Sequence, residues 1–140
     1  MFNNSEIKQN IRVNSYVEHM QAVKLMKEAS INVLILPDDE ESKGVYTGKI
    51  FDYIMSRKPI LGIMPREGVA ANLINESQIG KAVGHKDITE IKEFIINTYI
   101  RFKNGEDLDT DGINKCARFD RINLSKQLSL LFDEVDNKGN

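Results

Sequence analysis

Apolar residues recur along this chain in two patterns: short continuous runs, and longer segments with helical spacing. Continuous aliphatic runs occupy 31–36 and 60–64, as is typical of strands that are buried on both faces of a parallel sheet. A weaker run at 79–83 predicts a further strand, and the short β-branched segment 11–13 predicts the first one. The pattern therefore predicts about four strands.

The segments between these runs repeat apolar residues every three or four positions, which predicts helices. Ser15 and Glu18 have the spacing of a capping box at a helix start, and so do Asp87 and Glu90. The helix that begins near residue 47 is expected to end before Pro59, because proline cannot continue a helix. The last helix is predicted from Leu124, Leu128, Leu131, Phe132 and Val135, and residues 104–117 are predicted to form a loop.

Alternating strands and helices predict an α/β fold with a parallel sheet and helices on both faces. We therefore expect a three-layer Rossmann-like domain over residues 1–140, with a frayed tail at 136–140. A sheet of about four strands is small, since sheets usually have ~5–6. The domain is therefore expected to be incomplete, with an open sheet edge that favours self-association or a missing neighbour.

Composition narrows the classes of partner and the compartment. The 140 residues carry a formal net charge of -2 with both signs interspersed, so nothing in the charge favours binding to nucleic acid. No apolar run approaches the ~20 residues of a membrane span. The single cysteine, Cys116, excludes an internal disulfide, which fits a reducing compartment. A cytoplasmic location is expected, with attachment to the inner face of the membrane through a partner as a variant.

The segment between the two strongest runs carries the main candidate chemistry. Thr47-Gly48-Lys49 opens a predicted helix, where free N–H groups, the helix dipole and an ammonium group suit a phosphate. A plain helix cap fits the local sequence equally well. Asp52 lies one turn further on, either as a surface carboxylate near a helix start or as the acceptor for two ribose hydroxyls.

Other motifs in the chain are weaker. The segment 44–50 is not a Walker A loop, because three residues separate its glycines where four are needed, and isoleucine follows its lysine. The acidic run 38–41 suits a solvated loop better than a divalent-ion site. Arg66 follows a predicted strand at the same edge as Thr47, where a simple turn fits the sequence better than the alternative, a contact with a sugar or a phosphate. His19 and His85 fit no catalytic pattern, so neither a catalytic residue nor a metal ligand is assigned.

The order of these residues resembles the donor-binding half of glycosyltransferases that are built from two Rossmann-like domains. TGKIFDY at 47–53 and RKPIL at 57–61 are similar to the family's Gly/Pro-Lys-hydrophobic-aromatic-Glu-Tyr pattern and its later Lys-Pro and apolar strand. SYVEH at 15–19, with the helix after it and the apolar run to Pro37, resembles the family's preceding strand–helix–strand. FDR at 119–121, with the helix around Leu124, resembles its closing helix. The resemblance covers about residues 10–135.

The resemblance implies a nucleotide site with three parts. Residues 15–17 would line the nucleobase pocket, the N–H groups of 47–49 would hold the diphosphate, and Asp52, where the family usually has Glu, would accept the ribose hydroxyls. The implied donor-binding residues are Ser15, Tyr16, Val17, Thr47, Gly48, Lys49 and Asp52. Retaining members of the family often carry a further acid eight positions before the ribose acid, where this chain has Gly44. Glu40, Glu41 and Arg66 are therefore the candidates for contacts with the sugar.

The resemblance implies the C-terminal portion of a glycosyltransferase, which binds a nucleoside-diphosphate sugar for transfer to an acceptor held by a missing N-terminal domain. The expected process is surface polysaccharide assembly, with no cofactor other than the sugar nucleotide. Because the groups that would stabilise the leaving diphosphate are largely missing, we expect the isolated chain to bind weakly or not at all and to be inactive. The alternative is a non-catalytic nucleotide-sugar-binding or interaction module that self-associates through its open sheet edge.

Overall fold

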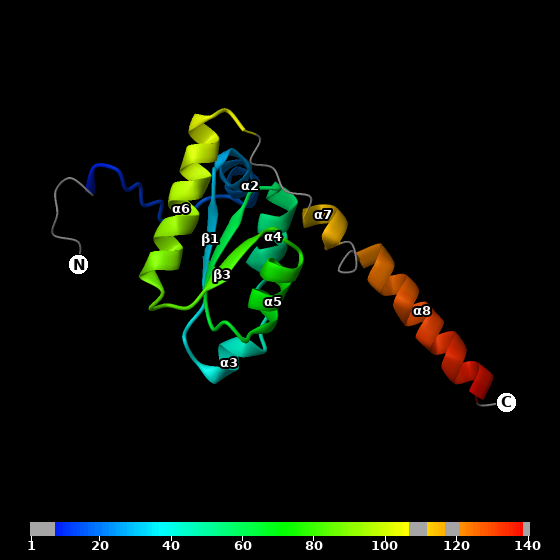
Figure 1. Ribbon diagram of the computed structural model, residues 1–140. Helices are drawn as coiled ribbons and strands as arrows, with labels where there is room; N and C mark the ends of the chain where they lie inside the picture. The colour runs from blue at the N-terminus through cyan, green and yellow to red at the C-terminus, as the bar shows by residue number, and fades with distance from the viewer. Residues whose placement is uncertain (1–7, 107–111, 117–120, 139–140) are drawn as a thin grey trace.

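A computed structural model describes residues 8–106, 112–116 and 121–138 (Figure 1). Three parallel strands form one open sheet in the order β1-β2-β3, with helices on both sides. The strands are β1 (Asn32–Ile35), β2 (Ile60–Ile63) and β3 (Gly80–Val83). The helices are α2 (His19–Glu28), α3 (Glu40–Lys43), α4 (Gly48–Ser56), α5 (Val69–Glu76), α6 (Ile88–Lys103), α7 (Gly112–Lys115) and α8 (Arg121–Lys138). The predicted α/β class is confirmed, and the small parallel sheet is compatible with a Rossmann-like fold.

The strand register divides the apolar side chains between two faces of the sheet. Leu34, Gly62 and Ala82 are aligned across the strands and face α4 and α5, which cover the main core. Leu61 and Val83 are buried on the opposite face, where α6 packs on β3. The core between the sheet and α4 and α5 contains Leu34, Leu36, Ile50, Ile54, Ile60, Met64, Ala70, Ala71, Leu73, Ile74, Ile79, Ala82 and Cys116.

Helix ends follow local sequence signals in several places. Helix α4 ends at Ser56, followed by Arg57 in the left-handed region (φ 64°) and by Pro59, as predicted. Helix α5 spans the predicted range 69–76. Helix α6 ends before Asn104 and Gly105, and Gly105 has φ 71°, a conformation that glycine adopts without strain. These signals act over a few residues, so the sequence alone was enough to place them.

The strand predicted at residues 11–13 is wrong. This segment has no regular structure, and Ile11 and Val13 are exposed. A strand is stabilised by hydrogen bonds to a neighbour and by a covered face, and this segment has no place in the three-strand sheet. The described sheet therefore has three strands instead of about four.

Both predicted capping boxes are wrong, for reasons that differ. Helix α2 begins at His19, and its N-cap residue, Glu18, makes no side-chain capping hydrogen bond. Asp87 does precede α6, but its carboxylate accepts hydrogen bonds from the Gly84 N–H (3.0 Å) and from Arg66 instead of capping its own helix. At the start of α6, Arg66 and Lys81 therefore bind the acids that the local pattern assigned to the cap.

The glycine in the weakest strand is required by close packing of the backbone. A Cβ atom on Gly80 would lie 1.9 Å from the carbonyl oxygen of Ile60. β3 can therefore pair closely with β2 at this point because residue 80 lacks a side chain.

Beyond α6, the chain carries two further helices. α7 lies inside the segment 104–117 that was predicted as a loop, although residues 107–111 and 117 fall outside the described part. Figure 1 shows α8 extending away from the body, on the side opposite α6. α8 continues to Lys138, into the segment predicted to fray. None of the described helices is both long enough and apolar enough to span a membrane.

Candidate functional site

Three loops meet at the carboxyl edge of the sheet. β1 leads through α3 to the start of α4, β2 leads through residues 64–68 to α5, and β3 leads through residues 84–87 to α6. Because the strands are parallel, these connections lie at one edge, which is where ligands bind in open α/β sheets. Thr47, Arg66 and His85 thus come from three segments that the sheet brings to a common edge.

The start of α4 has free polar groups and open space. Thr47 is the N-cap residue, yet its side chain makes no capping bond, and its Oγ1 is buried without a hydrogen-bond partner among the described residues. Gly48 and Lys49 are exposed, and no atom lies within 4 Å of the position that a Cβ on Gly48 would take. The first N–H groups of a helix have no partner within it, so this helix start is accessible to an anion.

Asp52 lies on the first turns of α4 and is half-buried. Its negative charge contributes to a raised pKa of the neighbouring Tyr53 phenol, although burial of the ring is the larger cause. The Tyr53 hydroxyl donates a hydrogen bond to the carbonyl oxygen of Val33 (3.3 Å), which holds α4 against β1. Asp52 therefore sits near the helix start on a helix that is anchored to the sheet.

The acids of the α3 segment make local contacts. The carboxylate of Asp39 accepts a hydrogen bond from the Ser42 N–H (2.8 Å), which caps α3 and lowers the pKa of Asp39. Glu40 contacts the Lys43 ammonium (2.6 Å) and raises the pKa of that lysine. Glu41 is exposed. Among the residues that the structure describes, no group of three or more His, Cys, Asp or Glu side chains is arranged to hold a metal ion.

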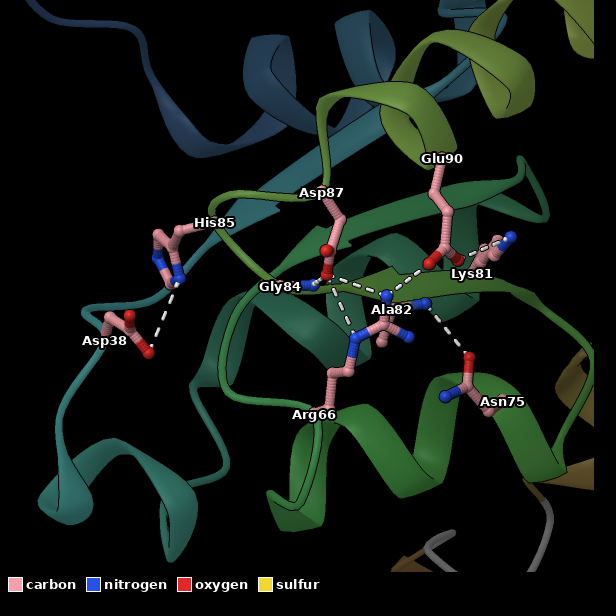
Figure 2. Close-up of polar contacts among 9 residues, drawn as sticks. All are labelled: Asp38, Arg66, Asn75, Lys81, Ala82, Gly84, His85, Asp87 and Glu90. Carbon is pink, nitrogen blue, oxygen red and sulfur yellow. Dashed lines mark hydrogen bonds and ion pairs between the residues drawn. The ribbon is translucent and has the colours of Figure 1, made fainter.

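Arg66 is held by a network of charges that the sequence did not reveal (Figure 2). Its Nε and Nη2 atoms lie 3.0 and 2.7 Å from Asp87 Oδ2, and Nη2 also contacts Glu90. Glu90 reaches Lys81 as well, at 2.8 Å. Lys81 and Arg66 together lower the pKa of Glu90, while Asp87 and then Glu90 raise the pKa of Arg66. The predicted sugar-contacting arginine is thus engaged by two carboxylates, Asp87 just before α6 and Glu90 in its first turn.

His85 links the ends of the two outer strands across β2. Its Nε2 lies 2.7 Å from the carbonyl oxygen of Leu36, and because a carbonyl only accepts, Nε2 carries the hydrogen. Nδ1 is buried without a hydrogen-bond partner among the described residues and lies 3.8 Å from Asp38 Oδ1 (Figure 2). In the neutral ring with hydrogen on Nε2, Nδ1 and the Asp38 carboxylate are both acceptors, so they make no direct hydrogen bond with each other.

The structure brings most of the predicted site residues to one edge of the sheet. Those at the carboxyl edge are Thr47, Gly48, Lys49, Asp52, Glu40, Glu41 and Arg66. The predicted nucleobase residues Ser15, Tyr16 and Val17 precede α2, and the Tyr16 side chain is 84% exposed. In Figure 1 the chain before α2 runs out on the side of α6, away from α3 and the start of α4.

Sequence reasoning missed His85 and the partners of Arg66. Asp38 and His85 lie two positions after a predicted strand and Asp87 lies four positions after one, so their place at the carboxyl edge was a signal that could have identified them. Comparisons of the chain with protein-family models, characterised proteins and solved structures found no match.

Proposed function

We propose that this chain is the donor-binding portion of a glycosyltransferase and binds a nucleoside-diphosphate sugar at the start of α4. The observation that carries the proposal is the open helix start at Gly48, at the carboxyl edge of a parallel sheet. An anion at this position would meet unpaired N–H groups, the positive end of the helix dipole and the Lys49 ammonium. The order of residues around Thr47–Tyr53, which resembles the donor segment of glycosyltransferases, supports the same assignment.

In the proposed complex, different residues of α4 bind different parts of the nucleotide. The Gly48 and Lys49 N–H groups and the Lys49 side chain bind the diphosphate, and Asp52 accepts hydrogen bonds from the ribose hydroxyls. Residues 15–17, the nucleobase contacts that the resemblance implies, are left out of this complex, because the chain before α2 runs out away from the start of α4. Departure of the nucleoside diphosphate builds negative charge, which the helix start stabilises in part. The acceptor and the remaining positive groups would come from an N-terminal domain, so this chain alone is expected not to turn over.

A second candidate is an interaction module, and the open edge of β1 favours it. The Asn32 and Leu36 N–H groups bond to Pro59 and Ile63, so these residues face β2. Alternate residues of a strand point their hydrogen-bonding groups to opposite sides, so Val33 and Ile35 direct their N–H groups to the open edge. Self-association through this edge, insensitive to every nucleotide, would be its signature.

A nucleotide titration followed by NMR of the isotope-labelled chain tests the proposed site. We expect millimolar nucleoside diphosphate to shift the amide signals of Gly48 and Lys49, with Lys49→Ala reducing the binding and Asp52→Ala removing the preference for the nucleotide over inorganic pyrophosphate. Lys27→Ala is the matched control, because Lys27 is an exposed lysine on α2. If millimolar nucleotide moves amide signals elsewhere in the chain but not those of residues 47–52, the donor-site proposal is refuted.

A further inference from the structure

The two ring nitrogens of His85 differ in their surroundings. The ring lies on the connection between β3 and α6, and its Nε2–H donates a hydrogen bond to the carbonyl oxygen of Leu36 (2.7 Å), directly after β1. This bond fixes the orientation of the ring, so a second proton can be added only at Nδ1. Nδ1 is buried and has no hydrogen-bond partner among the described residues. Protonation of the ring therefore creates a buried N–H donor that needs an acceptor.

The carboxylate of Asp38 is an acceptor that this donor can reach. Asp38 Oδ1 lies 3.8 Å from Nδ1, which is longer than a hydrogen bond and is expected while both groups are acceptors. Asp38 is 63% exposed and lies in the connection between β1 and α3, so its side chain can move without disturbing the core. A movement of about 1 Å would bring the two atoms to the usual N–H···O distance of about 2.9 Å. The protonated ring would then bind Leu36 and Asp38 together.

The other charged side chains around His85 have partners of their own or are exposed to solvent. Those from β3, from the β2–α5 connection and from the start of α6 bind one another; they are Arg66, Lys81, Asp87 and Glu90. In Figure 2 this network lies on one side of Gly84, and the contact between His85 and Asp38 lies on the other. The Asp39 carboxylate caps α3, and Lys86 is exposed, so solvent screens its charge. Among the described residues, Asp38 therefore carries the charge that Nδ1 meets directly.

From this geometry we propose that His85 and Asp38 form a pH-dependent clasp between the two outer strands of the sheet. While the ring is neutral, the contact between Nδ1 and Asp38 is open. When Nδ1 takes up a proton from solvent, which reaches the 26% exposed side chain, an ion pair with a charge-assisted hydrogen bond joins the two residues. The closed clasp draws the connection after β1 toward the connection after β3. Because the connection after β1 leads through α3 to the start of α4, the clasp changes the shape of the carboxyl edge whether or not a nucleotide binds there.

A double-mutant cycle measured at two pH values tests the clasp. Urea denaturation gives the free energy of unfolding of wild type, Asp38→Ala, His85→Gln and the double variant at about pH 8 and about pH 5, on either side of the range in which histidine changes its charge. The glutamine in His85→Gln still carries N–H donors but takes up no proton. We expect the two losses of stability to be additive at the higher pH. At the lower pH, the double variant should lose less than the sum of the two single losses, because each substitution removes the same ion pair.

His19 provides the matched control, because it is an exposed histidine on α2. A cycle of Asp38→Ala with His19→Gln should be additive at both pH values. Additive losses in the His85 cycle at the lower pH refute the clasp. A coupling of equal size at both pH values refutes it as well, because the contact would then not depend on protonation.

NMR of the isotope-labelled wild-type chain gives a readout that needs no substitution. At the higher pH we expect the hydrogen of His85 on Nε2, and at the lower pH a second hydrogen on Nδ1. The amide signals of residues 38–39 should shift together with protonation of this ring, and Asp38→Ala should abolish that shared response at the His85 ring. Protonation of the His19 ring should leave those amides unchanged. If the neutral ring carries its hydrogen on Nδ1, or if residues 38–39 do not respond, the clasp does not exist.

Discussion

Two regions of the same sheet edge differ in how their polar groups are satisfied. Around Arg66, each charged side chain has partners of opposite sign in Asp87, Glu90 and Lys81. Around Thr47, the cap hydroxyl is buried without a partner among the described residues, and the helix start beside it opens onto empty space. The charge network around Arg66 stabilises the fold, because it connects α6 to the loop after β2. The polar groups around Thr47 make no such stabilising contact among the described residues and are available to a ligand.

The difference between the regions follows from the cost of unmade hydrogen bonds. Leaving a buried polar group unpaired costs about 1–3 kcal/mol, and most buried groups in folded proteins are paired. Thr47 Oγ1 and His85 Nδ1 are the two such side-chain atoms found among the described residues, and both belong to segments at the carboxyl edge. Polar groups left unpaired at the place where this class of sheet binds ligands favour a functional explanation over a structural one.

The largest expected effect comes from removing Asp87, on the satisfied side. Asp87→Ala takes the hydrogen-bond acceptor away from the part-buried Gly84 N–H and from the Nε and Nη2 atoms of Arg66. We expect the free energy of unfolding, measured by urea denaturation, to fall by about 1–3 kcal/mol.

Asp38→Ala is the matched substitution on the other side of the edge. Asp38 is 63% exposed, and its contact with His85 spans 3.8 Å, so we expect its removal to change the free energy of unfolding by less than about 0.5 kcal/mol. If Asp87→Ala and Asp38→Ala lower the free energy of unfolding equally, the contrast is wrong: the contacts around Arg66 would then stabilise the fold no more than the rest of the carboxyl edge does.

The features that could be predicted from the sequence are those determined by residues close together in the chain. The start of α4 at Thr47-Gly48, the range 69–76 of α5 and the end of α6 all follow from caps, helix periodicity and turn residues within a few positions. The parallel sheet followed from continuous apolar runs at 31–36 and 60–64. Local chemistry therefore gave both the fold class and the region of the open helix start.

The parts that sequence did not predict depend on contacts between distant residues. Arg66 and Asp87 are 21 positions apart, and His85 reaches Leu36 across 49 positions. No spacing rule pairs such residues before the strand order is known. The same contacts explain the missing capping box at Asp87 and Glu90, because Arg66 and Lys81 bind the carboxylates that local rules assign to the helix start.

The next largest effect is expected on acidification. It should weaken the charge network around Arg66 and lower the free energy of unfolding by less than the loss of Asp87 does. Lys81 and Arg66 lower the pKa of Glu90 in the folded protein below its ordinary value of 4.5. The stabilisation from this carboxylate is therefore complete above about pH 4.5 and is lost as the pH falls through the lowered folded value. Urea denaturation between pH 6 and 3 should show a shallower loss of stability for Glu90→Gln than for wild type.

Glu93→Gln is the control for that titration, because Glu93 is an exposed acid on the same helix. We expect it to keep the wild-type steepness of stability against pH. If Glu90→Gln and Glu93→Gln give the same dependence of stability on pH, the Arg66 network stabilises the fold no more than ordinary surface charges do. The contrast between the surroundings of Arg66 and those of Thr47 would then be wrong.

The smallest expected effect is on the available side, at Thr47. An N-cap threonine normally costs about 0.5–2 kcal/mol to remove, because its side chain satisfies an N–H at the helix start. Thr47 makes no such bond, and valine has nearly the same shape without the hydroxyl. Thr47→Val should therefore not lower the free energy of unfolding, because it removes a buried hydroxyl that has no partner among the described residues, whereas Asp39→Ala, which removes a cap that is made, should lower it measurably. A Thr47→Val variant of wild-type stability whose Gly48 and Lys49 amides respond less to nucleoside diphosphate would assign the hydroxyl to the ligand. A large loss of stability would instead mean that Thr47 caps α4 in solution, and the helix start would then be as fully satisfied as the surroundings of Arg66.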